Sequence, residues 1–406
     1  MEMIRQLNRE ELAESIKLSE FAFQYELSSE QRAERMASTK PEDQWGYFID
    51  GKLAAKMTIH PMTTWINGRK MKFGGVASVA TWPEYRRKGM VGKLLVNALH
   101  IMREQGQTLA CLHPFEFPFY RKFGWETYVE YKEYELEAKH LPHYFTIDGR
   151  VERTEDRDLI KKLYAEYAEA YNGMLERTNE WWEIRFWKNK GSVVVFYNET
   201  GKPAGYLQYH VADSIMTVHD FVCLHEKARA SLWKFIANHD SMIRSVKLKA
   251  PADDPLPFIL QNPRFKQETI PYFMARVVDA EAFLREYKFT ATGRQTRLTL
   301  ALEDSHAPWN HQVFTVEISG AGEANIRPSG SLPEGSGMER NETGGHELQK
   351  AAADLSCDIQ TLTAMLIGYR SPELMHAIGR LQGSEAMVKE WAERLTSQTP
   401  YLMDYY

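Results

Sequence analysis

One stretch of the chain decides the expected fold: Val79-Ala80-Thr81-Trp82-Pro83-Glu84-Tyr85-Arg86-Arg87-Lys88-Gly89-Met90. Residues 76–81 are typical of the end of a β-strand, which Pro83 stops. Apolar residues then recur at helical spacing from Met90 to Arg103, so a helix follows. Three cations and a glycine lie between strand and helix. Because a helix start presents unpaired N–H groups and the positive end of the peptide dipoles, this loop suits a pyrophosphate.

The glycine of this loop, Gly89, would let the backbone approach an anion where a Cβ atom would clash. The alternative interpretation is a cationic loop in front of an ordinary surface helix. The loop resembles the acetyl-CoA motif of the GNAT N-acetyltransferases, Arg/Gln-x-x-Gly-x-Gly/Ala. Arg86 and Gly89 are in register with it, and Val91 stands where the motif has a small residue.

The composition is that of an ordinary globular protein. The 406 residues suggest two to four domains, with 43% hydrophobic and 26% charged residues. A net charge of −5 argues against a general nucleic-acid binder and leaves room for a cationic substrate. No apolar stretch approaches the roughly 18 residues of a membrane span, so we expect neither a signal peptide nor a membrane partner. Three scattered cysteines form no disulfide framework and no metal spacing, which favours a reducing cytoplasm.

The pattern along the chain divides it into three units, 1–140, 141–285 and 286–406. In the first unit helices alternate with strands, and Asp50-Gly51 and Asn67-Gly68 mark tight hairpins. This order predicts a mixed sheet with helices on both faces.

The second unit repeats features of the first. The turn Thr200-Gly201-Lys202 resembles Asp50-Gly51-Lys52, and a strand at 216–224 precedes a helix expected over 230–243. Residues 225–230, between that strand and helix, lack the glycine and the cation cluster. The second unit is therefore interpreted as a duplicate that has lost cofactor binding.

The third unit has strands first and helices afterwards, which is typical of an α+β domain. Strands are expected at 295–302 and 312–318, and helices at 358–368, 372–382 and 384–395. Residues 319–345 are rich in Gly, Ser and Glu, so we expect a long mobile loop there.

A second informative segment runs from Phe115 to Trp125 and contains Tyr120 in an aromatic context. A tyrosine hydroxyl near a thioester sulfur can protonate the leaving thiolate as a general acid. The residues alone favour the other interpretation, that Tyr120 is one of 20 tyrosines packing a core edge. His60, His113 and the pair His140/His143 have no partners at ligand spacing, so no metal site is expected.

The family resemblance favours the catalytic interpretation. The chain is similar, over essentially its full length, to the enhanced intracellular survival (Eis) family of GNAT acetyltransferases. Glu116, Tyr120 and Phe123-Gly124 match its Glu-x-x-x-Tyr-x-x-Phe-Gly signature, and the run from Arg86 to Met90 resembles its cofactor loop. The aromatic end of the chain, up to Tyr406, resembles the family's C-terminus.

The resemblance implies tandem GNAT folds, the second degenerate, followed by a sterol-carrier-protein-like domain. It implies that Tyr120 is the general acid and that the terminal carboxylate of Tyr406 is the general base. It also implies a set of contacts to acetyl-CoA, from Val79, Ala80, Thr81, Arg86, Arg87, Lys88, Gly89, Met90, Val91, Gly92, Phe115 and Glu116.

Substrate residues are predicted from chemistry. Phe23, Tyr25 and Glu26, placed on the first helix, could form an acidic and aromatic wall for an ammonium group, or equally a capped helix end. The expected activity is acetyl transfer from acetyl-CoA to a primary amine of a polyamine-like small molecule, with aminoglycosides the best-known family substrates. The family suggests a hexamer. Acetylation of protein lysines and non-catalytic binding of acyl-CoA or lipid are the competing hypotheses.

Overall fold

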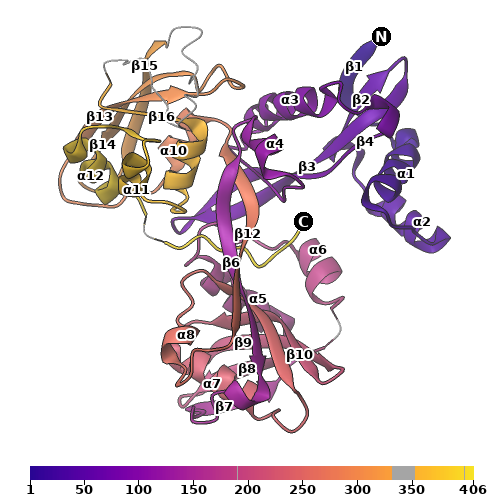
Figure 1. Cartoon of the computed structure of the whole chain (residues 1–406), viewed down its shortest axis with the longest axis vertical. Coiled ribbons are helices and arrows are strands. Elements are labelled where there is room, and N and C mark those ends of the chain that lie inside the picture. The colour runs from indigo at the N-terminus through magenta and orange to yellow at the C-terminus, as the bar shows by residue number, and fades with distance from the viewer. Residues whose placement is uncertain (190, 332–352, 397) are drawn as a thin grey trace.

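The computed structural model describes residues 1–189, 191–331, 353–396 and 398–406. These residues form three lobes that meet around β6 (Glu126–Glu137) and β12 (Lys266–Val277), two strands that cross the centre of Figure 1. Within the described ranges there is one sheet of twelve strands and one of five. The expected α/β fold with an α+β third unit is confirmed.

The large sheet joins the first two units into one continuous surface. Its strand order is β1-β2-β3-β4-β5-β12-β6-β11-β10-β9-β8-β7. The remaining strands of this sheet are β1 (Glu2–Gln6), β2 (Gln44–Ile49), β3 (Lys52–Ile66), β4 (Arg69–Thr81), β5 (Leu109–Leu112), β7 (Gly149–Arg153), β8 (Ser192–Asn198), β9 (Pro203–Ala212), β10 (Ile215–Cys223) and β11 (Ser245–Pro251).

The two units exchange their last strands. β6 follows the strands of the first unit but pairs with β11 of the second, over residues 131–137. β12 ends the second unit but pairs with β5 of the first, over residues 274–277. The two exchanged strands also pair with each other at the centre of the sheet. Each half of the sheet is thus completed by the other half.

The two halves follow the same plan, which confirms the predicted repetition. Antiparallel hairpins lead in each half to a parallel pair, β4 with β5 and β10 with β11. A helix follows the first strand of each pair, α3 (Met90–Glu104) in the first half and α7 (Glu226–Ala237) in the second. The helix expected over 230–243 therefore begins four residues earlier and ends six earlier. His225 caps it by accepting from the N–H of Ala228 at 3.2 Å, a cap that the sequence pattern did not reveal.

Helices cover both faces of the first half of the sheet, as predicted. The buried stripe of α3 consists of the apolar residues expected from the spacing, and it packs with Val76 and Leu112. On the other face, Leu18 of α1 (Leu12–Phe23) packs with Ala80. The other helices of the first two units are α2 (Ser29–Ser38), α4 (Phe117–Arg121), α5 (Arg157–Ala168), α6 (Asn179–Trp181) and α8 (Leu256–Ile259).

The third unit is a five-stranded sheet with short helices beside it. Its elements are α9 (Ala280–Glu286), β13 (Thr296–Glu303), β14 (Gln312–Ile318), β15 (Ala324–Ser331), β16 (Leu355–Asp358), α10 (Ile359–Leu366), α11 (Pro372–Ala377), β17 (Gln382–Gly383) and α12 (Glu385–Arg394). The strand order is β15-β14-β13-β16-β17. A buried ion pair, Arg276–Asp304 at 2.5 Å, ties this unit to β12.

Two expectations for the third unit were wrong. Part of the loop expected over 319–345 is the edge strand β15, which pairs along β14 and buries Ile326 in an otherwise polar sequence. The rest of that loop, from residue 332, lies outside the described residues. The helix expected over 372–382 ends at Ala377, and its last residue belongs to β17.

The C-terminal segment returns from the third unit to the junction of the first two (Figure 1). Asp404 is buried there, and its carboxylate accepts from Nη2 of Arg177 at 2.7 Å. The same guanidinium donates through Nη1 to Asp220 of β10 at 2.7 Å. Its carbon lies 3.9 Å from the ring centre of Tyr164, whose hydroxyl donates to Asp404. Arg177, with its side chain only 1% exposed, therefore anchors the end of the segment at Asp404.

The ion pairs of Arg177 with Asp404 and Asp220 give a stability prediction. Arg177→Leu leaves Asp404 and Asp220 buried without their cation, so we expect a loss of about 3–5 kcal/mol in the free energy of unfolding. Arg150→Leu is the matched control, because the ion pair of Arg150 with Glu152 is half exposed and is worth only about 0–1 kcal/mol. Urea denaturation of the full chain measures both. Equal losses in the two variants would contradict the anchoring role of Arg177.

None of the helices in the described ranges is long and apolar enough to cross a membrane.

Candidate active site

The candidate site begins where β4 and β5 part. Their parallel pairing ends at Val76 and Leu112. β4 continues to Thr81 with β3 as its partner, and a bulge interrupts that pairing where Ser78 takes a positive φ of 51°. Beyond Val76, the edge of β4 that faces β5 has no strand partner in the described chain. Val79, Ala80 and Thr81, three of the predicted acetyl-CoA contacts, lie on this stretch.

The cationic loop follows directly. Arg86, Arg87 and Lys88 are exposed, and none of them forms an ion pair with a described residue. Arg87 and Gly89 both have left-handed backbones, with φ of 61° and 76°. Gly89 is the N-cap of α3 and offers no side chain to the helix start, so the N–H groups of the first turn stay free for another acceptor. These features fit an anionic group such as a diphosphate.

A Cβ atom built at Gly89 meets no protein atom within 4 Å, so the space in front of this residue is not filled by the described protein. The positive φ of Gly89 is a second reason for glycine at this position. Gly92 is the position with a close contact. A Cβ atom there would lie 2.7 Å from the ring of Phe123. The Phe-Gly part of the signature and the start of α3 are therefore packed against each other.

Tyr120 lies on α4 with its ring buried, 2% exposed. It packs edge-on against Phe115 at 5.2 Å and Trp125 at 6.5 Å between ring centres. Burial raises the pKa of the Tyr120 phenol above its ordinary value, so the hydroxyl keeps its proton at neutral pH. Its hydroxyl makes no hydrogen bond within the described ranges. Phe115 and Glu116, the other two predicted contacts, are exposed in front of it.

The last residues of the chain lie against the opposite side of the same two strands. The ring of Tyr406 occupies the space that a side chain at Gly75 would fill, because a Cβ atom there would be 2.9 Å from it. The ring also lies 4.9 Å from Phe273 and 5.8 Å from Phe73. Tyr120 packs with Val76, which points to the other face because successive strand residues alternate. The two predicted catalytic residues therefore flank β4 and β5 from opposite faces.

The predicted substrate residues are placed differently from the expectation. Only Phe23 is on α1, as its last residue, while Tyr25 and Glu26 lie in the connection to α2. Gln24 ends the helix with a left-handed backbone, φ 56°. The residue that joins this region to the cationic loop is Phe21, whose ring lies 5.2 Å from that of Trp82. The sequence gave no signal for this contact, because Phe21 is an exposed residue near the end of an amphipathic helix.

Lys56 is a further residue that sequence reasoning missed. It pairs with Ala80 across β3 and β4, and its side chain is buried beneath α1. Its Nζ bonds the hydroxyls of Ser15 at 3.0 Å and Ser19 at 2.6 Å. Burial, with a smaller contribution from Arg35, lowers the pKa of Lys56 to about 7. A lysine within a strand is usually on the surface, so only the fold identifies Lys56 as a buried residue.

His113, one of the histidines considered for a metal site, packs among aromatic rings. The ring of His113 lies at the end of β5 among the rings of Tyr272, Phe273 and Tyr405, at 5.1–5.5 Å. In the described part of the chain, no group of three or more His, Cys, Asp or Glu side chains is arranged to hold a metal ion. Trp182 of the second unit is buried beside Tyr164 and Phe186.

Comparison with known families agrees with this arrangement. Residues 3–128 and 173–277 each match an acetyltransferase (GNAT) domain family, and residues 280–403 match the sterol carrier protein domain. The chain is a tandem GNAT N-acetyltransferase with a sterol-carrier-like third domain.

Individual relatives cover different shares of this acetyltransferase. An N-acetyltransferase of Streptomyces avermitilis is 21% identical over 94% of this chain and 92% of its own. The crystal structure of a probable N-acyltransferase from Enterococcus faecalis superimposes with a TM-score of 0.88 at 27% identity, over all of both chains. N-acetyltransferase Eis of Mycobacterium tuberculosis is 23% identical over 48% of this chain and 52% of its own. By sequence, the similarity to Eis thus extends over about half of the acetyltransferase.

The loop gives a prediction for cofactor binding. Arg87→Glu places a carboxylate where a diphosphate would lie, and Gly89→Val forces a β-branched residue into a left-handed backbone. We expect both to raise the apparent KM for acetyl-CoA by about tenfold or more while the KM for the amine changes little. Lys122→Glu makes the same charge change on an exposed residue of the same lobe and is the control. An unchanged acetyl-CoA titration in both loop variants would remove the assignment.

Proposed function

We propose that this N-acetyltransferase transfers the acetyl group of acetyl-CoA to a primary amine of a polyamine-like small molecule, such as an aminoglycoside. The observation that carries the proposal is the edge of β4 beyond Val76, which has no strand partner among the described residues. It leads into three cations that form no ion pair with a described residue, and then to the start of α3, where Gly89 supplies no side-chain cap. A thioester held along that edge would have its diphosphate at the helix and its acetyl group between Tyr120 and Tyr406. We place the chain with the Eis acetyltransferases on this arrangement and on the partial sequence similarity.

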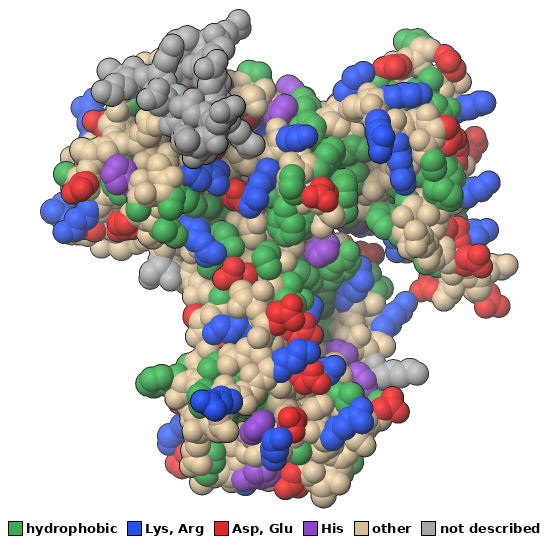
Figure 2. Space-filling view, in the orientation of Figure 1, with side chains coloured by type: hydrophobic (Ala, Val, Ile, Leu, Met, Phe, Trp, Pro, Cys, Tyr) green, Lys and Arg blue, Asp and Glu red, His purple; other side chains and the backbone are tan. Residues whose placement is uncertain are grey.

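The predicted substrate residues offer groups that suit a cationic acceptor. Phe23 is the last residue of α1, and Tyr25 and Glu26 lie between α1 and α2 on the chain. Figure 2 shows the lobe that carries α1, α2 and α3, where Lys and Arg side chains are interspersed with Asp and Glu side chains. Ring faces and a carboxylate both attract an ammonium group, and we assign this wall to the amine.

The division of labour among the units follows the predicted boundaries, 1–140, 141–285 and 286–406. We assign catalysis to the first unit, with Arg86 to Gly92 on the diphosphate and Val79 to Thr81 along the pantetheine arm. Phe115 and Glu116 complete this contact set. The three cysteines are free thiols, which supports a reducing, cytoplasmic setting.

Proton movement is assigned to two residues. The α-carboxylate of Tyr406 takes a proton from the incoming ammonium, directly or through water, and the phenol of Tyr120 gives a proton to the leaving sulfur. The Tyr120 phenol is protonated at neutral pH, as a proton donor must be, although burial raises its pKa and makes it a weaker acid. Asp404 is not available as a base, because Arg177 and Tyr164 bind its carboxylate.

Thiol release from acetyl-CoA with a panel of amines tests the proposal. The panel contains kanamycin, spermidine and a lysine peptide, and we expect turnover with the first two and more than one acetyl group on kanamycin. Turnover with the lysine peptide alone would favour a protein lysine acetyltransferase. Lipid binding with no turnover on any amine would favour the non-catalytic alternative.

The general acid gives a prediction. Tyr120→Phe keeps the ring and removes the proton donor, so acetyl-CoA should bind normally while kcat falls by about 10²- to 10⁴-fold. Tyr144→Phe, in an exposed tyrosine of the second unit, should leave kcat unchanged. Steady-state kinetics with calorimetric acetyl-CoA binding separates the two effects. Wild-type turnover in Tyr120→Phe would exclude Tyr120 as the acid.

The general base gives a second prediction. Amidation of Tyr406 by protein ligation removes only the negative charge of the terminus, and we expect turnover to fall across pH 6–9. Unmodified ligated protein is the control for the ligation itself. If the amidated enzyme kept its circular dichroism spectrum and its turnover, the carboxylate would not be the base, and Glu26 would become the next candidate.

We propose a hexamer, on the resemblance to the Eis family alone. Light scattering of the full chain at micromolar concentration should give about six times the 47.1 kDa chain mass. A mass equal to one chain would contradict it.

A further inference from the structure

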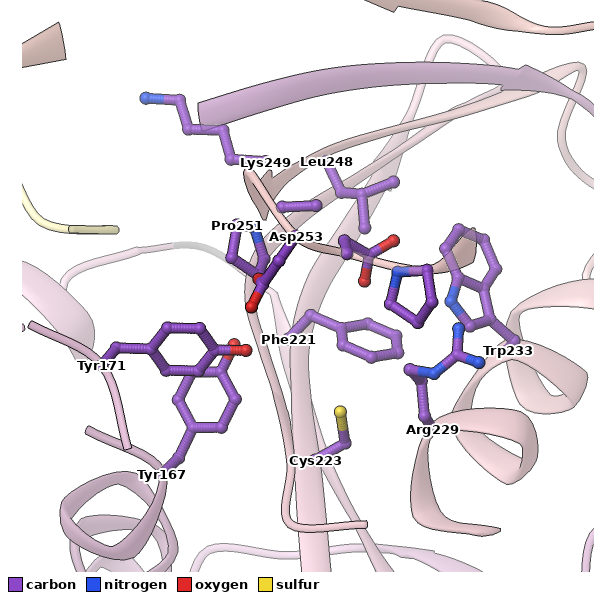
Figure 3. Close-up of a pocket in the computed structure, with 13 residues that line it drawn as sticks. Tyr167, Tyr171, Phe221, Cys223, Arg229, Trp233, Leu248, Lys249, Pro251 and Asp253 are labelled. Carbon is purple, nitrogen blue, oxygen red and sulfur yellow. The ribbon is translucent and has the colours of Figure 1, made fainter. Parts of the chain in front are cut away.

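The second unit contains its own opening between parallel strands. β10 and β11 pair in parallel only as far as Thr217 and Lys247, after which both strands continue apart. A cavity of about 170 Å³ lies beyond that point (Figure 3). It occupies the place in the second unit that the candidate cofactor site occupies in the first.

This cavity is not a copy of the cofactor site. The start of α7 is capped by its own residue, His225, so the N–H of Ala228 is not offered to a phosphate. The volume is close to the roughly 150 Å³ of an engineered cavity that binds benzene, so the room is for a small ligand. Acetyl-CoA is far larger than such a ligand.

One N–H group of an arginine in the wall has no acceptor among the described residues. Arg229 is 4% exposed and lines the cavity from the first turns of α7. Its Nε and Nη2 donate to Glu226, at 2.9 and 2.7 Å. Its Nη1 is buried and has no hydrogen-bond partner among the described residues. A buried N–H without an acceptor is costly, and a carboxylate entering the cavity would supply one.

The facing wall is acidic. Asp253 and Asp254 follow β11 and line the same cavity. Asp254 accepts through Oδ1 from the N–H of Leu256, and Asp253 accepts through Oδ2 from the hydroxyl of Thr399 at 2.7 Å. Each carboxylate therefore has a second oxygen for which the structure records no hydrogen bond. The remaining wall is largely aromatic, with Tyr167, Tyr171, Phe221 and Trp233 around the space in Figure 3.

We propose that this cavity binds a small zwitterion of amino-acid size, which carries one carboxylate, one ammonium group and an apolar body. The carboxylate would accept from Nη1 of Arg229, and the ammonium group would donate to Asp253 or Asp254. The aromatic side chains would enclose the apolar body. Lys249 is the remaining cation of the wall, and its Nζ lies 4.5 and 4.9 Å from the ring centres of Tyr131 and Tyr272.

The cavity is connected to the segment that leads to Tyr406. Besides the bond from Thr399 to Asp253, the ring of Tyr401 lies 5.6 Å from that of Tyr171. The hydroxyl of Tyr401 also donates to the carbonyl of Lys249, at 3.4 Å. An occupant would thus contact residues that hold the C-terminal segment.

Protection of Cys223 tests the site without any need for catalysis. Cys223 lines the cavity and is partly exposed, whereas Cys111 and Cys357 are buried. Burial raises the pKa of Cys223 to about 12, so the thiol reacts slowly and its rate can be followed by peptide mass spectrometry. The full chain is treated with iodoacetamide at pH 8.5 alone or with L-leucine, isopentylamine or 4-methylpentanoate. The last two probes lack the carboxylate and the amine of leucine, respectively.

We expect L-leucine at ten times its Kd to slow alkylation of Cys223 about tenfold, and the other two probes to protect little. Arg229→Gln should abolish the protection by leucine. Lys227→Gln removes the same charge from the same helix start outside the cavity and should retain it. Equal protection by 4-methylpentanoate, protection that survives in Arg229→Gln, or no protection by leucine at 10 mM would each overturn the proposal.

Discussion

The position of the C-terminal segment depends on one buried cation and its two carboxylate partners. Arg177 lies in the second unit and binds Asp220 on β10 and Asp404, two residues before Tyr406. Isolated charges are costly in a protein interior, so these three groups are stable only together. The aromatic rings around the guanidinium exclude water and strengthen the attraction. The C-terminal segment is thereby fixed to the second unit.

The role of the degenerate unit follows from this interaction. The second unit lacks the cationic loop, and its helix start is capped, yet it supplies Arg177, Asp220 and the strand that completes the first unit. It positions the segment that brings Tyr406 against Gly75. The second unit, which has no counterpart of the cationic loop, is in this chain part of the framework around the first.

Local features were predictable from the sequence, and long-range ones were not. The buried stripe of α3 and the hairpins at Asp50 and Asn67 depend on spacing and turn residues within a few positions, and the predictions of both features were correct. The exchange of β6 and β12 leaves no local signal, because each strand has the same alternation whichever partner it takes. The bond between Arg177 and Asp404 joins residues 227 positions apart. Lys56 was missed because its burial depends on α1, and β15 was missed because an edge strand with one buried residue has a loop-like composition.

The strand exchange also constrains how the chain can fold during synthesis. β5 leaves the ribosome early, but its partner β12 is made only after nearly the whole second unit, on the order of ten seconds later. Until then the first unit exposes an open strand edge beside an apolar core, a state that is prone to aggregation. The first unit cannot complete its sheet as an independent domain, so the order of translation requires either a temporary cover for that edge or a delay of folding until β12 appears.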